Sequence, residues 1–125
     1  MKKTYNLHTI QEWNEFKQKT SSSPYGLIIF KFSPNCPISR SVERGFDPWY
    51  AQLPEEVELL CARIDVINAR ALSQQIAQEL HIPHESPQAI WLKPDATLHW
   101  HANHYAITSE ALNTQLQKLK VNVFP

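Results

Sequence analysis

A single cysteine between an apolar run and a proline is the residue best placed for chemistry in this chain. Cys36 is separated from the run Leu27–Phe32 by residues 33–35, and Pro37 follows it directly. Proline favours the first position of a helix because its φ is preset and its missing N–H would have no partner inside the helix. Cys36 is therefore predicted to be the N-cap residue of a helix that begins at Pro37.

The predicted N-cap position gives Cys36 the environment of a nucleophile. Its sulfur is expected to face the free N–H groups of Ile38 and Ser39 and the positive end of the helix dipole, which stabilises a thiolate more than a neutral thiol. Ser39 stands where the second cysteine of a Cys-x-x-Cys redox motif would stand. Its hydroxyl can hydrogen-bond to a thiolate but cannot attack a disulfide. The chemistry predicted is therefore monothiol: Cys36 captures a sulfur, and a second thiol from elsewhere releases it.

The composition fits one globular domain over residues 1–125. The chain has 42% hydrophobic residues and 12 basic against 12 acidic residues, so nothing indicates a nucleic acid or an anionic membrane as a partner. No apolar run is long enough for a signal peptide or a membrane span, and we expect a cytoplasmic protein. Two cysteines do not form a secreted disulfide framework, and two glycines leave no glycine-rich phosphate loop.

Hydrophobic spacing predicts the elements that position Cys36. Thr9 and Glu12 form a capping-box pattern that opens a first helix, which runs to about Lys19. Residues 26–32 form a buried strand. The helix from Pro37 ends before Pro54, and its inner face is predicted to comprise Ile38, Val42, Phe46, Trp49, Tyr50 and Leu53. Because proline also occupies position 48, we expect a kink near residues 44–48 or a helix in two pieces.

The second half of the chain adds strands over residues 57–65, 88–93 and 97–101. A helix capped by Asn68 lies between the first two of them, and a last helix opens at Thr108 or Ser109. The element order is then α-β-α-β-α-β-β-α. Long crossovers imply parallel strands and the short final connection implies an antiparallel hairpin. We predict an α/β domain with a central four-stranded mixed sheet flanked by helices.

This order of elements resembles the thioredoxin superfamily. Two short motifs narrow the resemblance to the monothiol bacilliredoxins of the bacillithiol system: Cys36-Pro37-Ile38-Ser39, which opens the second helix, and Ser86-Pro87-Gln88, which opens the third strand. The resemblance covers essentially the whole chain. It implies a protein that removes bacillithiol, a low-molecular-weight thiol, from mixed disulfides on S-thiolated client proteins, with no metal.

The resemblance also implies a role for each residue of the two motifs. Cys36 would be the attacking nucleophile and Ser39 its unreactive neighbour, with Pro37 opening the helix between them. Pro87 would be the superfamily's cis-proline beside the cysteine, although cis X–Pro bonds are uncommon. The backbone of Ser86 would pair with an extended substrate segment as an additional strand does.

Other residues admit a structural and a functional interpretation. Cys61 lies in the middle of a strand, where a free cysteine usually acts as a small hydrophobic residue rather than as a resolving thiol. His99 and His101 are expected to share one face of a strand, as a pair of metal ligands would, but no third ligand has a suitable spacing. His84 and Glu85 precede Pro87 and are expected to border Cys36, where either charge would change the stability of its thiolate.

Two other functions compete with thiol exchange. A glutaredoxin-type iron–sulfur carrier would hold a cluster through Cys36 and an external thiol, but such carriers favour Cys-Gly-Phe-Ser, and Pro37-Ile38 is bulkier. A non-catalytic binding module would use the same groove only for docking. It predicts that Cys36→Ser leaves partner binding intact.

Overall fold

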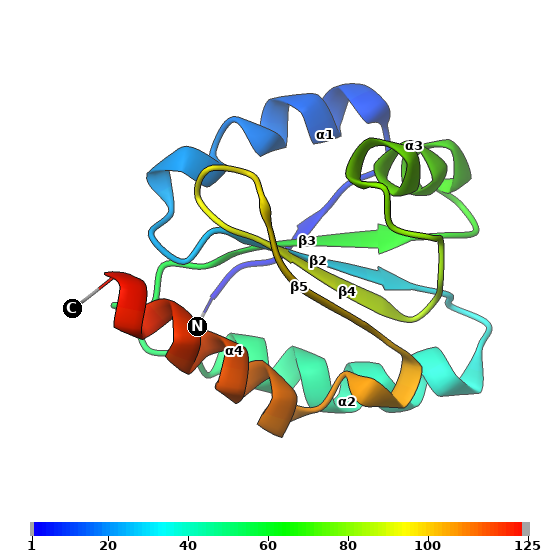
Figure 1. Ribbon diagram of the computed structural model, residues 1–125. Helices are drawn as coiled ribbons and strands as arrows, with labels where there is room; N and C mark the ends of the chain where they lie inside the picture. Colours follow the sequence, from blue (N-terminus) through cyan, green and yellow to red (C-terminus); the bar gives the residue numbers. More distant parts are fainter. Residues whose placement is uncertain (1, 124–125) are drawn as a thin grey trace.

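A five-stranded sheet with helices on both faces forms the architecture of the protein. The computed structural model describes residues 2–123. In Figure 1, helices α1 and α3 cover one face of the sheet, and α2 and α4 cover the other. The elements, with η for short 3₁₀ helices, are β1 (Tyr5–Asn6), α1 (Ile10–Lys17), η1 (Thr20–Ser22), β2 (Leu27–Phe32), α2 (Pro37–Ala51), β3 (Leu60–Asp65), α3 (Arg70–Leu80), β4 (Gln88–Leu92), β5 (Leu98–Asn103), η2 (His104–Ala106) and α4 (Ser109–Val123).

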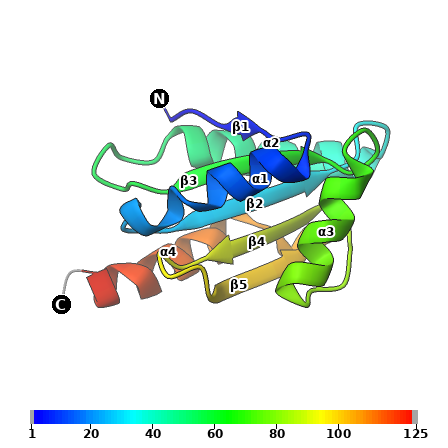
Figure 2. The same cartoon turned by 90° about the horizontal axis from the view of Figure 1, so that it is seen from above.

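The sheet order is β1-β3-β2-β4-β5, so β2, which leads to Cys36, is the central strand. It pairs parallel with β3 and antiparallel with β4, and β4 pairs antiparallel with β5. The predicted mixed sheet with a final hairpin is therefore confirmed. Figure 2 shows the strands from the side of α1 and α3, with β2 between β3 and β4.

The predicted count of four strands is wrong, because an additional edge strand precedes the first helix. Strand β1 pairs parallel with β3, with Tyr5 opposite Ala62 and Asn6 opposite Arg63. Its two residues are too few to show the alternating pattern from which strands are predicted. Strand β3 is also shorter at its start than expected, beginning at Leu60.

Helix α2, which begins beside Cys36, is a single helix from Pro37 to Ala51. The expected alternative of a helix in two pieces is wrong, and the alternative of a kink near residues 44–48 stays a prediction. Val42, Phe46, Trp49 and Tyr50 are buried on one face, as predicted, and their packing on the sheet offsets the hydrogen bond that proline removes. Ile38 departs from that prediction, since it is 36% exposed at the first turn.

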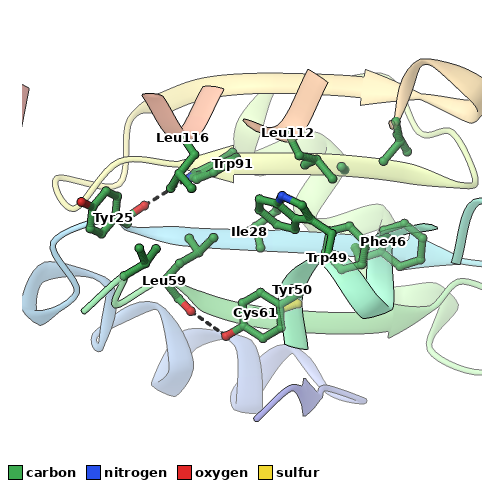
Figure 3. Packing of buried hydrophobic residues seen from close by; sticks show 14 of the residues in the cluster. Tyr25, Ile28, Phe46, Trp49, Tyr50, Leu59, Cys61, Trp91, Leu112 and Leu116 are labelled. Atoms are coloured by element: carbon green, nitrogen blue, oxygen red, sulfur yellow. Dashed lines mark hydrogen bonds between the residues drawn. The ribbon is translucent and has the colours of Figure 1, made fainter. Parts of the chain in front are cut away.

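The apolar core between the sheet and helices α2 and α4 fixes α2 in place. Phe46 of α2 stacks on Phe30 of β2 with ring centroids 4.4 Å apart. Two buried polar groups are satisfied within this core, and both hydrogen bonds are drawn in Figure 3. The Tyr50 hydroxyl donates to the Leu59 carbonyl at 2.5 Å, and the Trp91 indole N–H donates to the Tyr25 carbonyl at 2.9 Å. A second cluster, which includes Trp13, Phe16, Leu72 and Ile76, lies between the sheet and helices α1 and α3.

Three of the four predicted helix starts are confirmed, and that of α2 at Pro37 is one of them. The capping box of Thr9 and Glu12 is present, and the Thr108 hydroxyl accepts the Ala111 N–H at the start of α4, so both predictions are confirmed. Asn68 does not cap α3, because it is part of a turn in which Asp65 accepts the Asn68 N–H. Helix α3 begins at Arg70 without a side-chain cap. Within residues 2–123, no helix is long and apolar enough to cross a membrane.

Candidate active site around Cys36

Cys36 is the N-cap residue of α2, as its position before Pro37 predicts. Its backbone is extended, with φ −102° and ψ 122°, and its carbonyl accepts the Arg40 N–H at 3.1 Å. The thiol is partly exposed. No N–H of the first turn donates a capping hydrogen bond to the sulfur. That the sulfur faces the amides of Ile38 and Ser39 stays a prediction. The fold thus presents a free, accessible thiol at the start of a helix.

Ser39 is fully buried and stabilises the loop that carries Cys36. Its hydroxyl oxygen accepts the Ser33 N–H at 3.0 Å. The Cys36 N–H in turn donates to the Ser33 carbonyl at 3.2 Å. These two bonds join the end of β2 to the first turn of α2. Ser39 therefore positions the cysteine through the backbone of Ser33 rather than through a bond to the sulfur.

The Ser86–Pro87 peptide bond is cis, as the resemblance predicts. Gln88 is opposite Lys31 in the register of β2 and β4, so Pro87 comes beside Phe32, where β2 ends and the loop to Cys36 begins. The Pro87 carbonyl accepts the His104 N–H at 2.9 Å. Within residues 2–123, no backbone hydrogen bond involves the N–H or carbonyl of Ser86. The two sequence motifs therefore lie at the same end of the sheet, where the backbone of Ser86 is unpaired.

Cys61 lies within strand β3, away from the strand ends that carry the two motifs. It is fully buried, it is opposite Ile28 in β2, and burial raises the pKa of its thiol. Ile28 precedes Phe32 by four residues, which corresponds to about 13 Å of strand. A disulfide needs Cα atoms within about 7 Å of each other. In this fold Cys61 acts as a small hydrophobic residue of the core, as expected from its position in a strand.

His84 and Glu85 both have partners other than Cys36. The His84 Nδ1 atom lies 3.2 Å from the Ser73 hydroxyl, and Glu85 Oε1 lies 3.2 Å from His104 Nε2. Burial, and then the charge of Lys31, lower the pKa of His84. The effect of these two residues on the Cys36 thiolate remains a prediction.

The prediction that His99 and His101 share one face of a strand is wrong. A β-bulge interrupts the pairing of β4 and β5 near Trp91. His99 packs edge-on against the Trp91 ring and bonds through Nε2 to the Gln115 carbonyl of α4, whereas His101 is opposite Ile90, whose side chain points to the other face. Within the described residues, no three histidine, cysteine, aspartate or glutamate side chains form a cluster suited to a metal ion.

The structure adds two features that sequence analysis missed. Lys31 is fully buried in β2, where its ammonium group donates to the Ser73 carbonyl at 2.9 Å and burial lowers its pKa to about 8. A lone lysine inside an apolar run was the signal for it. In addition, Ile38, Ile67 and Tyr105 are exposed at 36%, 57% and 64%. They come shortly after the ends of β2, β3 and β5, so they lie at the same end of the sheet as the Cys36 loop.

Solved structures with a similar fold include oxidoreductases. A structure described as a suggested oxidoreductase with a thioredoxin fold matches with a TM-score of 0.74 and 26% identity, covering 90% of this chain and 93% of that one. Thioredoxin from Fasciola hepatica matches with a TM-score of 0.68 and 15% identity over 94% of this chain and all of its own. Thioredoxin from Trypanosoma brucei brucei gives a TM-score of 0.68 and 12% identity, covering 94% of this chain and 90% of its own. The fold is therefore thioredoxin-like.

The sequence also matches the model of one protein family. The profile described as monothiol bacilliredoxin BrxC matches residues 5–112, a range that includes the Cys36 motif and the cis-proline motif as well as all five strands. The structural likeness to an oxidoreductase at 26% identity agrees with a role in thiol redox chemistry. The chain belongs to the monothiol bacilliredoxin family.

Proposed function

We propose that this protein removes a low-molecular-weight thiol, bacillithiol in the family's setting, from mixed disulfides on cytoplasmic client proteins. The observation that supports this most is that one cysteine thiol is accessible, whereas the other is buried and no resolving cysteine stands next to the first. Cys36 is partly exposed at a helix N-cap, at the end of the sheet where the cis-proline lies. Ser39 occupies the position of a resolving cysteine, and Cys61 is buried. One accessible thiol with no resolving partner is suited to capturing a thiol and passing it on.

The proposed reaction has two exchange steps. First, the Cys36 thiolate attacks the sulfur of the small thiol in the client's mixed disulfide. A Cys36–small-thiol disulfide forms, the old disulfide breaks, and the client cysteine leaves as a thiolate that takes a proton from solvent. Second, the thiolate of another small thiol molecule attacks the bound small thiol, which releases Cys36 and forms the small thiol's own disulfide. No net oxidant is consumed in the first step, because one disulfide replaces another.

The surroundings of Cys36 support binding of a client chain. Ser86 offers an unpaired backbone N–H and carbonyl next to the cis-proline, and an extended segment could pair there as an added strand. Ile38, Ile67 and Tyr105 supply exposed apolar surface at the same end of the sheet, and such surface commonly marks a binding site. Client selection then depends on backbone pairing and apolar contact more than on charge.

Intact-mass spectrometry tests the proposal. The protein is incubated with oxidised bacillithiol and, in parallel, with oxidised glutathione, and we expect a gain of one small thiol per chain. Cys36→Ser is expected to abolish the gain. Cys61→Ser is the matched control, because it removes a thiol that is fully buried and is expected to leave the gain intact. A preference for bacillithiol would support the proposed co-substrate.

The decisive second measurement uses a client carrying a bacillithiol mixed disulfide. The wild-type protein is expected to release the client thiol, and Cys36→Ser is expected to release none. If Cys36 takes up no thiol from either disulfide, the exchange proposal is refuted, and a binding module remains. Such a module predicts that Cys36→Ser still binds clients. A coloured protein after anaerobic reconstitution with iron and sulfide would instead support a cluster carrier.

A further inference from the structure

A small pocket opens at the start of α3, on the side of the sheet opposite α2. Its volume is about 240 Å³. Figure 2 shows α3 and the loop that leads into it at the same end of the sheet as the start of α2. The residues that line the pocket are Val66, Ile67, Arg70, Ser73, Gln74 and His84. No carboxylate is among them.

The charges around this pocket are positive. The Arg70 guanidinium group lies in its wall, and the buried ammonium group of Lys31 is bonded to the carbonyl of Ser73, another residue of that wall. Lys31 and Arg70 both act electrostatically on the His84 ring, and both lower its pKa. Helix α3 begins at Arg70 without a side-chain cap, so the positive end of its dipole points to the same place. Three independent sources of positive potential therefore converge on one cavity.

The two acidic residues next in sequence to lining residues, Asp65 and Glu85, both have partners. Asp65 accepts hydrogen bonds from the Ile67 and Asn68 N–H groups through Oδ1, and from the Asn68 side-chain amide through Oδ2. Glu85 raises the pKa of His84, but its carboxylate lies 3.2 Å from His104. Within the described residues, Arg70 has no ion-pair partner. An anion that enters the pocket would find an unpaired guanidinium group.

The pocket lies beside the end of β2, the strand that leads to the Cys36 loop. The Val66 N–H in its wall donates to the Phe32 carbonyl at 2.9 Å, and Phe32 is the last residue of β2 before that loop. His84 precedes the cis-proline Pro87 by three residues. Pockets that hold a whole drug-sized ligand usually measure about 300–1,000 Å³. A pocket of about 240 Å³ suits one arm of a ligand whose sulfur is attached elsewhere.

The geometry points to an anion subsite in which Arg70 and His84 bind a carboxylate of the small thiol that is joined to Cys36 through a disulfide. This inference rests on the proposed thiol exchange and specifies the chemistry of its co-substrate. Arg70 supplies the charge and a bidentate hydrogen-bonding geometry, and His84, held by Ser73, supplies a second polar contact. The site thereby selects acidic small thiols over neutral or cationic ones of the same length.

The test measures how fast Cys36 is modified by three disulfides of similar size and different charge. They are the disulfides of thioglycolate, which is anionic, of mercaptoethanol, which is neutral, and of cysteamine, which is cationic. Rates come from intact-mass time courses with the full chain. Because intrinsic reactivity differs among the disulfides, each rate is compared with that of a variant for the same disulfide. Arg70→Gln and His84→Gln are the variants, and Arg44→Gln is the control, because it removes the same charge from an exposed site on α2.

We expect Arg70→Gln to slow modification by the thioglycolate disulfide about three- to tenfold, as loss of a charge-assisted contact predicts. The rate with the mercaptoethanol disulfide is expected to stay unchanged, and the rate with cystamine is expected to rise. His84→Gln is expected to act in the same direction with a smaller effect, and Arg44→Gln is expected to show no charge selectivity. Added salt reduces the selectivity of the wild type.

Two results overturn the inference in distinguishable ways. If Cys36 reacts with all three disulfides and Arg70→Gln changes none of the rates, or changes all of them equally, the anion subsite is wrong while thiol exchange stands. In that case the pocket either binds a charged group of the client protein or binds no ligand. If Cys36 reacts with none of the disulfides, the exchange function itself fails and the subsite fails with it.

Discussion

The buried charge of Lys31 destabilises the folded protein by an amount that can be measured. Its side chain is fully buried in the central strand, and burial lowers its pKa from 10.5 to about 8. At about 1.36 kcal/mol for each pH unit, the charged form is less stable in the folded protein than in the unfolded chain by about 3 kcal/mol. Near pH 7 both states bind the proton, so the folded state bears this whole cost.

The variant Lys31→Met keeps an unbranched side chain and removes the charge. It also removes the hydrogen bond to the Ser73 carbonyl, which costs about 1 kcal/mol. We therefore expect Lys31→Met to be more stable than the wild type by about 2 kcal/mol at pH 7. Between pH 8 and 10.5 the unfolded chain still binds a proton that the folded wild type has lost, so wild-type stability gains on that of the variant. Above this range the wild type is expected to be the more stable protein by about 1 kcal/mol.

Urea denaturation followed by circular dichroism, at pH 7 and again above pH 10, gives both differences. Cys61 and Tyr50, whose pKa values burial raises, are present in both proteins, so their effects cancel in the comparison. Lys118→Met is the matched control, because it removes an exposed lysine of α4 and is expected to change stability little at either pH. The reasoning is refuted if Lys31→Met is less stable than the wild type at pH 7, or if the difference is the same at both pH values.

Two further predictions concern the helix that begins beside Cys36. Ser39→Cys places a second thiol on the first turn of α2, so mild oxidation is expected to form a disulfide with Cys36. Mass spectrometry would show it as a loss of two hydrogens, and two free thiols after oxidation would contradict the placing of Ser39 at the position of a resolving cysteine. Arg63→Met removes the guanidinium group that pairs with Glu43 and Asp47 and holds α2 against β3. Chemical denaturation is expected to show a loss of about 1–2 kcal/mol, and unchanged stability would mean that packing alone fixes the helix.

The local chemistry around Cys36 follows from residues within one turn of each other. A proline after the cysteine determines where α2 starts, and Thr9 with Glu12 determines where α1 starts, because caps are made by neighbouring backbone and side-chain groups. The apolar run before Cys36 likewise predicts a buried central strand. Pro87 could be predicted to be cis only through the family resemblance, since the spacing of residues alone does not specify the isomer.

Other features needed partners that are distant in the sequence. Strand β1 is too short to predict and exists because β3 offers its edge. Asn68 has the right type for a cap, but Asp65 binds the same turn first, so α3 starts later. His99 and His101 point to opposite faces of β5, and not to one face as predicted, because a bulge in the final hairpin shifts the alternation of side chains. A bulge is a property of strand pairing and not of one strand's sequence.

The sequence by itself determined that one cysteine would stand at a helix start with a serine in place of a resolving thiol, because that depends on four consecutive residues. The tertiary structure alone decided which other residues lie toward the same end of the sheet. It brings Pro87 to the end of β2, buries Lys31 beneath Ser73, and gathers Arg70 and His84 into one pocket. The physical reason is that burial, register and electrostatic potential depend on which segments pack together, and these segments are separated by tens of residues.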